Sequence, residues 1–197
     1  ISGRSTETAL HCVVQEIEKS HHYKQYTLAS FLDIQGAFNN VHTEAIGNVL
    51  LELGIENYLR EWIITMLNNR IITSELGNIK LSKKVRRGTP QGGVISPLLW
   101  LIVINHILVK LDNRGVKVVA YADDVVILVS GKFLDVISDI MSDALGILQR
   151  WSTRCGLGVN PSKTELVLFT TKTKYSLKLP RICNQEIPLL RNAKYRE

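Results

Sequence analysis

The chain has 197 residues, of which 45% are hydrophobic and 21% are charged, and its formal net charge at pH 7 is +6. This balance excludes a disordered tail, is typical of a folded domain with its own core, and favours a polyanionic partner without proving one. The three cysteines form no CxxC pair, so neither a disulfide framework nor a zinc site is indicated, and we expect free thiols in a reducing compartment.

The first half of the chain predicts helices and strands from its apolar spacing. Residues 6–20 carry apolar side chains at helical spacing, and residues 26–34 (YTLASFLDI) are β-prone. Two helices over 43–53 and 56–69 and a hairpin over 70–85, turning near Gly77 and Asn78, are expected next.

The second half begins with a loop, RRGTPQGG, over residues 86–93. A helix that begins near Pro97 contains the longest apolar run, residues 98–109, which is too short to cross a bilayer and predicts a buried helix. Strands follow over 117–121 and 125–129, a long helix over 133–154, a strand over 164–169 and a further hairpin within 176–190.

Without the 70–85 hairpin, this order is βαββαβ, so we predict an α+β fold of the ferredoxin-like type. No repeat, low-complexity tract or Pro/Gly-rich linker marks an internal boundary, so we expect one domain over residues 1–197. The chain begins ISGRST and ends NAKYRE, and we expect it to be a fragment of a larger protein.

Three aspartates stand where apolar strands end or turn. Asp33 lies near the end of one strand, and Asp123 and Asp124 lie in an apolar hairpin. Ionised carboxylates in such surroundings are costly without a cation, and Mg²⁺ prefers carboxylate oxygens together with substrate phosphates. By spacing alone, a polar hairpin turn is as well supported as a metal site, because Asp is common in turns.

Five motifs in order resemble those of reverse transcriptases. YADD at 121–124 is similar to their catalytic hairpin, FLDIQGAF at 31–38 to the strand with the first metal-binding aspartate, and RRGTPQGGVISPLLW at 86–100 to their nucleotide- and template-positioning loop. LGVNPSKTELVLF at 157–169 resembles the lysine-bearing motif that follows, and GRST at 3–6 resembles the end of the fingers motif. The residues IQGAF at 34–38 and SPLLW at 96–100 resemble those of non-LTR retrotransposons of the jockey and R1 groups. Group II intron enzymes carry a similar GTPQGGVISPLL.

The resemblance implies an RNA-directed DNA polymerase, a nucleotidyltransferase of the right-hand type. The chain would hold its palm and the end of its fingers, without the thumb and most of the fingers. Asp33, Asp123 and Asp124 would hold two Mg²⁺ ions, with Mn²⁺ as a substitute, while a primer 3′-hydroxyl attacks a deoxynucleotide triphosphate. The implied partners are an RNA template, a DNA primer and dNTPs, with no membrane, and the implied location is intracellular, at the nuclear chromosomal target.

Further residues acquire roles through the same resemblance. Phe38 would exclude a ribose 2′-hydroxyl, with a core aromatic as the alternative. Lys163 would approach the triphosphate and protonate the leaving pyrophosphate, with an ordinary surface lysine as the alternative. Gln91 and Gly92 would contact the nucleotide, with a simple turn as the alternative. Nucleotide contact is further implied for Arg4, and nucleic-acid contact for Arg86, Arg87 and Tyr121.

Some observations leave alternatives open. Arg86 and Arg87 are nearly as well explained as a solvated basic strand edge, and the five histidines show no metal-ligand spacing and are expected to be structural. Asn39 stands where the family has Asp after the aromatic, and Asn can cap the next helix as Asp does. The alternatives to a retrotransposon enzyme are a group II intron-type enzyme and an inactive remnant that only binds nucleic acid. We expect the isolated fragment to be inactive.

Overall fold

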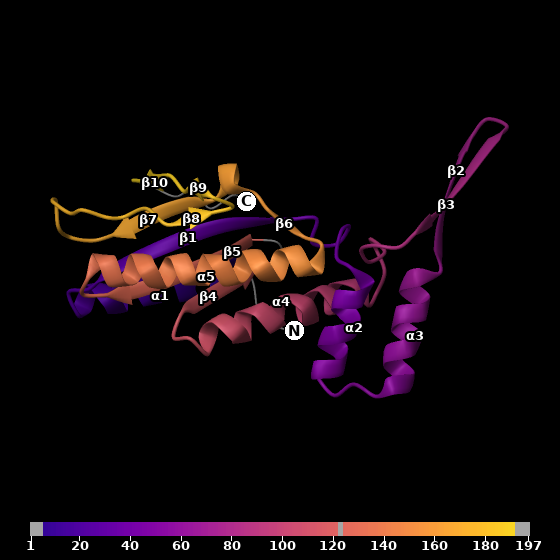
Figure 1. The fold of residues 1–197 in the computed structure, drawn as a ribbon, viewed down its shortest axis with the longest axis horizontal. Helices are drawn as coiled ribbons and strands as arrows, with labels where there is room; N and C mark the ends of the chain where they lie inside the picture. Colours follow the sequence, from indigo (N-terminus) through magenta and orange to yellow (C-terminus); the bar gives the residue numbers. More distant parts are fainter. Residues whose placement is uncertain (1–5, 122–123, 192–197) are drawn as a thin grey trace. The chain divides into compact units, whose positions relative to one another are not determined.

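The computed structural model describes residues 6–121 and 124–191 and has a mixed α+β fold (Figure 1). The chain divides into two compact units. The first, here the sheet unit, comprises Ile1–Gln35, Ile107–Ser152 and Gly158–Glu197, and the second, here the hairpin unit, comprises Gly36–His106 and Thr153–Leu157. The helices are α1 (Thr6–His22), α2 (Thr43–Glu52), α3 (Asn57–Asn68), α4 (Ser96–Asp112), α5 (Leu134–Cys155) and the short 3₁₀ helix η1 (Pro161–Lys163). The strands are β1 (Tyr26–Gln35), β2 (Arg70–Leu76), β3 (Ile79–Val85), β4 (Lys117–Tyr121), β5 (Asp124–Gly131), β6 (Gly158–Val159), β7 (Glu165–Phe169), β8 (Arg181–Ile182), β9 (Gln185–Glu186) and β10 (Leu189–Leu190).

The sheet unit is built on a sheet with β1 near its centre. Its strand order is β10-β7-β1-β5-β4, and β6 pairs with the end of β1. The pairs β1–β5, β1–β7 and β4–β5 are antiparallel, and β10 runs parallel to β7. The predicted βαββαβ arrangement is therefore confirmed, since its four strands lie together as β7-β1-β5-β4.

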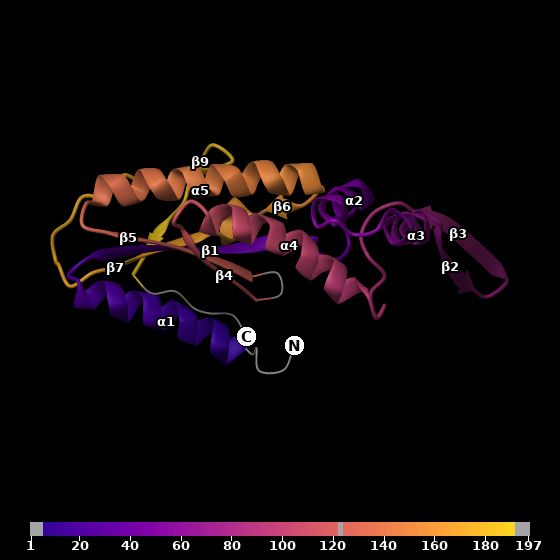
Figure 2. The same ribbon diagram turned by 90° about the horizontal axis from the view of Figure 1, so that it is seen from below.

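Helices cover both faces of this sheet, which explains why its central strands are nearly continuous apolar runs. Figure 2 shows α1 on one face and α5 on the other. Val13 of α1 packs in one cluster with Ala29 of β1 and Leu128 of β5. On α5 the buried side chains recur at helical spacing and form one apolar stripe: Ile137, Met141, Ala144, Leu145, Leu148 and Trp151.

The hairpin unit contains the helix pair α2 and α3 and the two-stranded ribbon β2–β3 (Figure 1). Ile46 and Leu50 of α2 and Leu67 of α3 are buried. The predicted turn of the hairpin is confirmed, because Leu76 pairs with Ile79 across Gly77 and Asn78.

One expectation needs correction. The apolar run of α4 predicted a buried helix, but Leu98, Leu101 and Val109 are about half exposed, because only one stripe of the helix faces the core. The predicted hairpin within 176–190 is confirmed as the short antiparallel pair β8–β9, and the chain then adds β10 to the main sheet. No helix in the described part of the chain is both long and apolar enough to cross a membrane.

Candidate active site

The strand register brings two of the predicted aspartates face to face. Asp33 of β1 is the direct antiparallel partner of Asp124, the first residue of β5. Directly opposite residues have Cβ atoms roughly 4.5–5.5 Å apart, and like charges at such positions are destabilising. A cation close by would offset this repulsion.

The hairpin between β4 and β5 is very tight. Tyr121 pairs directly with Asp124, so only two residues lie between the paired ones. The third predicted aspartate, Asp123, is one of these two and lies outside the described residues. Tyr121 is 41% exposed, which leaves its ring accessible to a ligand. Among the described residues, no three His, Cys, Asp or Glu side chains gather closely enough to hold a metal ion.

The predicted lysine reaches the same place from the far end of the chain. The Lys163 ammonium Nζ lies 2.8 Å from Oδ2 of Asp33. Its backbone position is fixed by the short helix η1, where Asn160 Oδ1 accepts hydrogen bonds from the backbone N–H and the hydroxyl of Ser162. Just before η1, Val159 pairs with Ile34, and this pairing anchors the segment beside the end of β1.

The carboxylates of Asp33 and Asp124 are hard oxygen donors, and the ammonium group of Lys163 lies beside Asp33. The Asp33 side chain is 24% exposed and that of Lys163 is 48% exposed, so solvent and ions have access to the carboxylate. Carboxylate oxygens that keep access to water suit Mg²⁺ or Mn²⁺. The chemistry of the donor set therefore fits a divalent metal, and the Lys163 ammonium adds a positive charge beside Asp33.

The hairpin unit holds the predicted aromatic and the predicted nucleotide loop together. The Phe38 ring is half-buried and lies 5.9 Å from the Trp100 ring, at an interplanar angle of 47°. The carbonyl of Phe38 accepts a hydrogen bond of 2.6 Å from the backbone N–H of Thr89. A Cβ on Gly88, whose φ is +70°, would lie 2.5 Å from the carbonyl oxygens of Phe38 and Asn39. Only glycine permits this approach.

The loop also explains the role of Asn39. Gln91 Nε2 donates a hydrogen bond of 3.1 Å to Oδ1 of Asn39. The expectation that Asn39 caps the next helix is wrong, because the N-cap of α2 is His42. Gly92 follows with φ +81° and no atom within 4 Å of an added Cβ, so its backbone is open to an approaching ligand.

Of the predicted arginines, Arg4 lies outside the described residues, and Arg86 and Arg87 are exposed. The sequence reasoning missed Arg70, which fixes the backbone of this segment. Its Nε donates to the Leu67 carbonyl at 2.9 Å, and its Nη2 donates to the carbonyls of Arg87 and Gly88 at 2.9 and 2.6 Å. Burial lowers the pKa of the Arg70 guanidinium. No sequence pattern distinguishes Arg70 from the other basic residues of the hairpin.

Comparison with known proteins places this geometry in a family. The family described as "Reverse transcriptase (RNA-dependent DNA polymerase)" matches residues 1–181. The chain is 29% identical over 194 residues to the "Putative 115 kDa protein in type-1 retrotransposable element R1DM" of Drosophila melanogaster, covering 98% of this chain and 18% of that protein. It is 26% identical over 175 residues to the "RNA-directed DNA polymerase from mobile element jockey" of the same species, covering 85% of this chain and 19% of that protein.

The fold resembles that of telomerase. The structure of apo telomerase from Candida tropicalis, truncated from its C-terminal domain, aligns with a TM-score of 0.64 at 13% identity, covering 87% of this chain and 36% of that chain. The chain spans about a fifth of the length of the two retrotransposon relatives. The predicted resemblance to retrotransposon enzymes is confirmed, and the chain belongs to the reverse transcriptase (RNA-dependent DNA polymerase) family.

Proposed function

We propose that this chain carries the catalytic centre of an RNA-directed DNA polymerase of a non-LTR retrotransposon. One observation supports the proposal most directly: Asp33 and Asp124 are cross-strand partners, and Lys163 contacts Asp33, in a chain of the reverse transcriptase family. The retrotransposon reading is favoured over a group II intron enzyme because the relatives named above belong to retrotransposable elements.

Asp33, Asp124 and the adjacent Asp123 are the proposed metal ligands. We favour two Mg²⁺ ions, with Mn²⁺ as a substitute, because the donors are carboxylate oxygens open to water. When bound, such ions stabilise the charge on the attacking and leaving oxygens of a phosphoryl transfer. In the reaction, the primer 3′-hydroxyl attacks the α-phosphate of a dNTP and pyrophosphate leaves. β1 and β5 hold Asp33 and Asp124 opposite each other before substrate arrives, so these two residues need little reorganisation.

Other side chains supply charge and shape. Lys163 Nζ would balance the triphosphate charge and give a proton to the leaving pyrophosphate oxygen. Phe38, whose backbone is held by Thr89, would exclude a ribose 2′-hydroxyl by its volume. Gln91 and Gly92 would meet the incoming nucleotide. We assign contacts with the RNA template and DNA primer, or with substrate phosphates, to the remaining predicted residues: Arg4, Arg86, Arg87 and Tyr121.

The test is primer extension on an RNA template. The chain spans only about a fifth of the length of its relatives. The assay therefore uses a chimera, in which residues 1–197 replace the matching segment of the jockey polymerase. Asp33→Asn and Asp124→Asn should each lower the extension rate at least about a hundredfold, since each removes a charge where the transition state is most negative.

Asp112→Asn serves as the matched control, because Asp112 is an exposed carboxylate at the end of α4, and it should leave the rate near that of the parent chimera. Extension at the parent rate by either active-site variant would show that the aspartate concerned is not a metal ligand.

A further inference from the structure

A pocket in the hairpin unit lies where β3 runs into the RRGTPQGG loop and meets α2 and α3. Its volume is about 380 Å³. Polar and basic residues dominate its lining, with Ile64 as the one apolar side chain and Glu44 as the one carboxylate. We call it the hairpin-base pocket, and its other lining residues are His42, Thr43, Asn68, Arg86 and Arg87.

The backbone that presents the two arginines is held from several sides. Thr43 Oγ1 donates to the Arg86 carbonyl at 3.3 Å, and the backbone N–H of Gly88 donates to the Val41 carbonyl at 2.8 Å. The Arg70 guanidinium donates to the carbonyls of Arg87 and Gly88. The pocket is therefore preorganised at the level of its backbone, which reduces the entropy cost of binding.

The two arginine side chains of the pocket have no internal partner in the described part of the chain. Within residues 6–121 and 124–191, neither Arg86 nor Arg87 forms an ion pair or a side-chain hydrogen bond. The His42 side chain, at the N-cap of α2, makes no capping hydrogen bond. Its ring instead lies against Gly156, where an added Cβ would come within 2.3 Å of ring atoms. Glycine at 156 thus leaves room for the imidazole.

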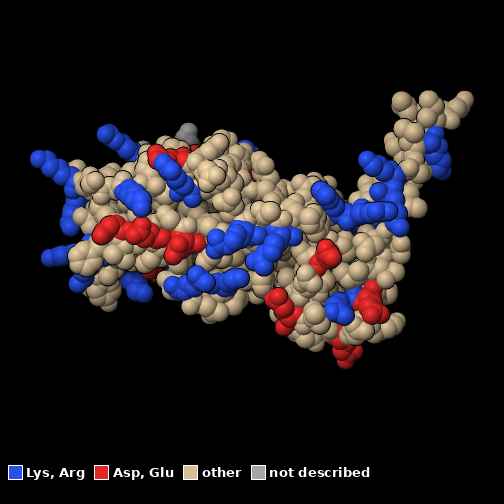
Figure 3. Space-filling view, viewed as in Figure 1, with Lys and Arg blue, Asp and Glu red and all other residues tan. Residues whose placement is uncertain are grey.

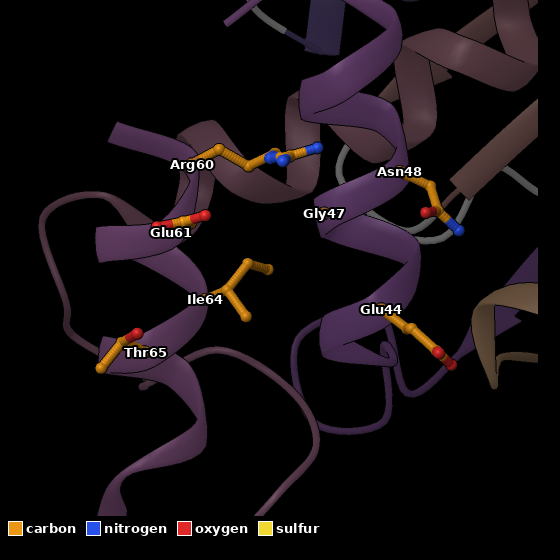
Figure 4. A pocket seen from close by; sticks show the side chains of 7 residues that line it. All are labelled: Glu44, Gly47, Asn48, Arg60, Glu61, Ile64 and Thr65. Atoms are coloured by element: carbon orange, nitrogen blue, oxygen red, sulfur yellow. The ribbon is translucent and has the colours of Figure 1, made fainter. Parts of the chain in front are cut away.

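A neighbouring pocket between α2 and α3 shows the contrast (Figure 4). It is also lined by Glu44 and Ile64, but its arginine, Arg60, shares the lining with two carboxylates, Glu44 and Glu61. Arg60 also donates to Oδ1 of Asn57. Figure 3 shows Lys and Arg side chains gathered along the β2–β3 hairpin and at its base, while Asp and Glu lie over α2 and α3. Of these two neighbouring pockets, the hairpin-base pocket is the one with more basic than acidic side chains in its lining.

We propose that the hairpin-base pocket binds a phosphate group of a nucleic-acid strand. Guanidinium forks match the paired oxygens of a phosphate, and the Asn68 amide and His42 imidazole add hydrogen-bond donors around them. Recognition of phosphate follows from the pocket itself. The choice of a strand, rather than a free nucleotide, as its carrier rests on the proposed function.

The first experiment measures binding of a fluorescently labelled single-stranded RNA to the chain by anisotropy at several salt concentrations. Arg86→Ala/Arg87→Ala should weaken binding by about tenfold or more and lower the slope of log Kd against log salt by roughly 0.7 or more. Lys83→Ala/Lys84→Ala removes the same charge from exposed positions of β3 outside the pocket. This control should weaken binding only about threefold or less.

Arg86→Lys/Arg87→Lys keeps the charge but loses the planar forks, so its affinity should fall between those of the parent and the alanine variant. Circular dichroism checks that each variant is folded. Equal losses in the alanine variant and in the Lys83/Lys84 control would overturn the proposal, because they would show general attraction. So would unchanged RNA affinity in the folded alanine variant.

A second arm identifies the carrier of the phosphate. The His42 ring resonances are followed by NMR during titration with RNA, a dNTP or inorganic phosphate. RNA should shift them at the lowest concentration. A dNTP acting at lower concentration than RNA would overturn the assignment to a strand. Neither arm needs polymerisation, so failure of this proposal and failure of the proposed catalysis are distinguishable.

Discussion

Replacing Lys163 by Met tests whether its ammonium group competes with a divalent metal for the Asp33 carboxylate. The Lys163 ammonium lies 2.8 Å from Oδ2 of Asp33, an oxygen that the proposed metal would need. A divalent ion must therefore displace the ammonium or accept its repulsion. Methionine keeps most of the side-chain length but removes the charge, so the variant should bind divalent metal more tightly than the parent chain.

The magnitude follows from the distance and the exposure of the pair. At 2.8 Å and an effective dielectric constant of 20, the attraction is about 6 kcal/mol before desolvation and entropy are counted. With Lys163 48% exposed and Asp33 24% exposed, most of that is cancelled, and exposed pairs contribute about 0.2–1 kcal/mol. Taking roughly 1 kcal/mol, we expect Mn²⁺ affinity to rise about fivefold.

The assay is a titration of the chain with Mn²⁺, in which electron paramagnetic resonance reports the free ion. Lys132→Met removes an exposed positive charge elsewhere in the sheet unit and should change the affinity little. Unchanged or weaker Mn²⁺ binding in Lys163→Met, with the control behaving like the parent, would refute the idea that the ammonium and the metal compete for Asp33.

Three further predictions concern other parts of the chain. In the jockey chimera, Phe38→Val should raise kcat/KM for ribonucleotides relative to deoxynucleotides by about one to three powers of ten, because the ring edge no longer meets the 2′-hydroxyl; an unchanged ratio would make Phe38 a core aromatic. In urea denaturation of the chain, Gly88→Ala should lower the free energy of unfolding by more than Gly54→Ala does, by about 1–3 kcal/mol. Both glycines have φ +70°, but only at Gly88 would a Cβ meet backbone oxygens, so equal losses would show that the contact is unimportant. Burial raises the pKa of the Cys155 thiol from 9.0 to about 11, so the folded state favours the protonated thiol. The stability that this group contributes is therefore present below pH 9 and is lost as the pH rises towards 11. The free energy of unfolding should fall by roughly 2 kcal/mol over this range. In the same denaturation measurement, a Cys155→Ala chain should lose correspondingly less of its free energy of unfolding at alkaline pH.

Local pattern was sufficient for the main strands and for their order. Residues 26–34 and 125–129 are apolar runs bounded by polar residues, and their pairing follows from the βαββαβ order. The amino-acid composition does not predict the division into two units, because the unit boundaries fall inside the continuous helices α4 and α5. The strand β10 has only two residues, and its place beside β7 depends on tertiary pairing that no local pattern encodes.

The candidate site was predictable only in part. Antiparallel pairing predicts that Asp33 and Asp124 meet, and the family resemblance singled out Lys163, but its contact with Asp33 joins residues 130 positions apart. The Gln91–Asn39 hydrogen bond depends on how two loops pack, which sequence spacing does not specify. The roles given to all the site residues remain predictions, and two of these residues, Asp123 and Arg4, lie outside the described part of the chain.

We infer that the end of β1 and the β4–β5 hairpin together hold a divalent metal. Iron-mediated cleavage tests it on the chain itself: Fe²⁺ is bound in place of Mg²⁺, and ascorbate with peroxide then generates radicals that cut the nearby backbone. If the metal binds there, cuts should be concentrated around Asp33 and Asp124, suppressed by added Mg²⁺ and lost in Asp33→Asn. Cuts at other places only, or cuts near Asp124 that persist unchanged in Asp33→Asn, would contradict it.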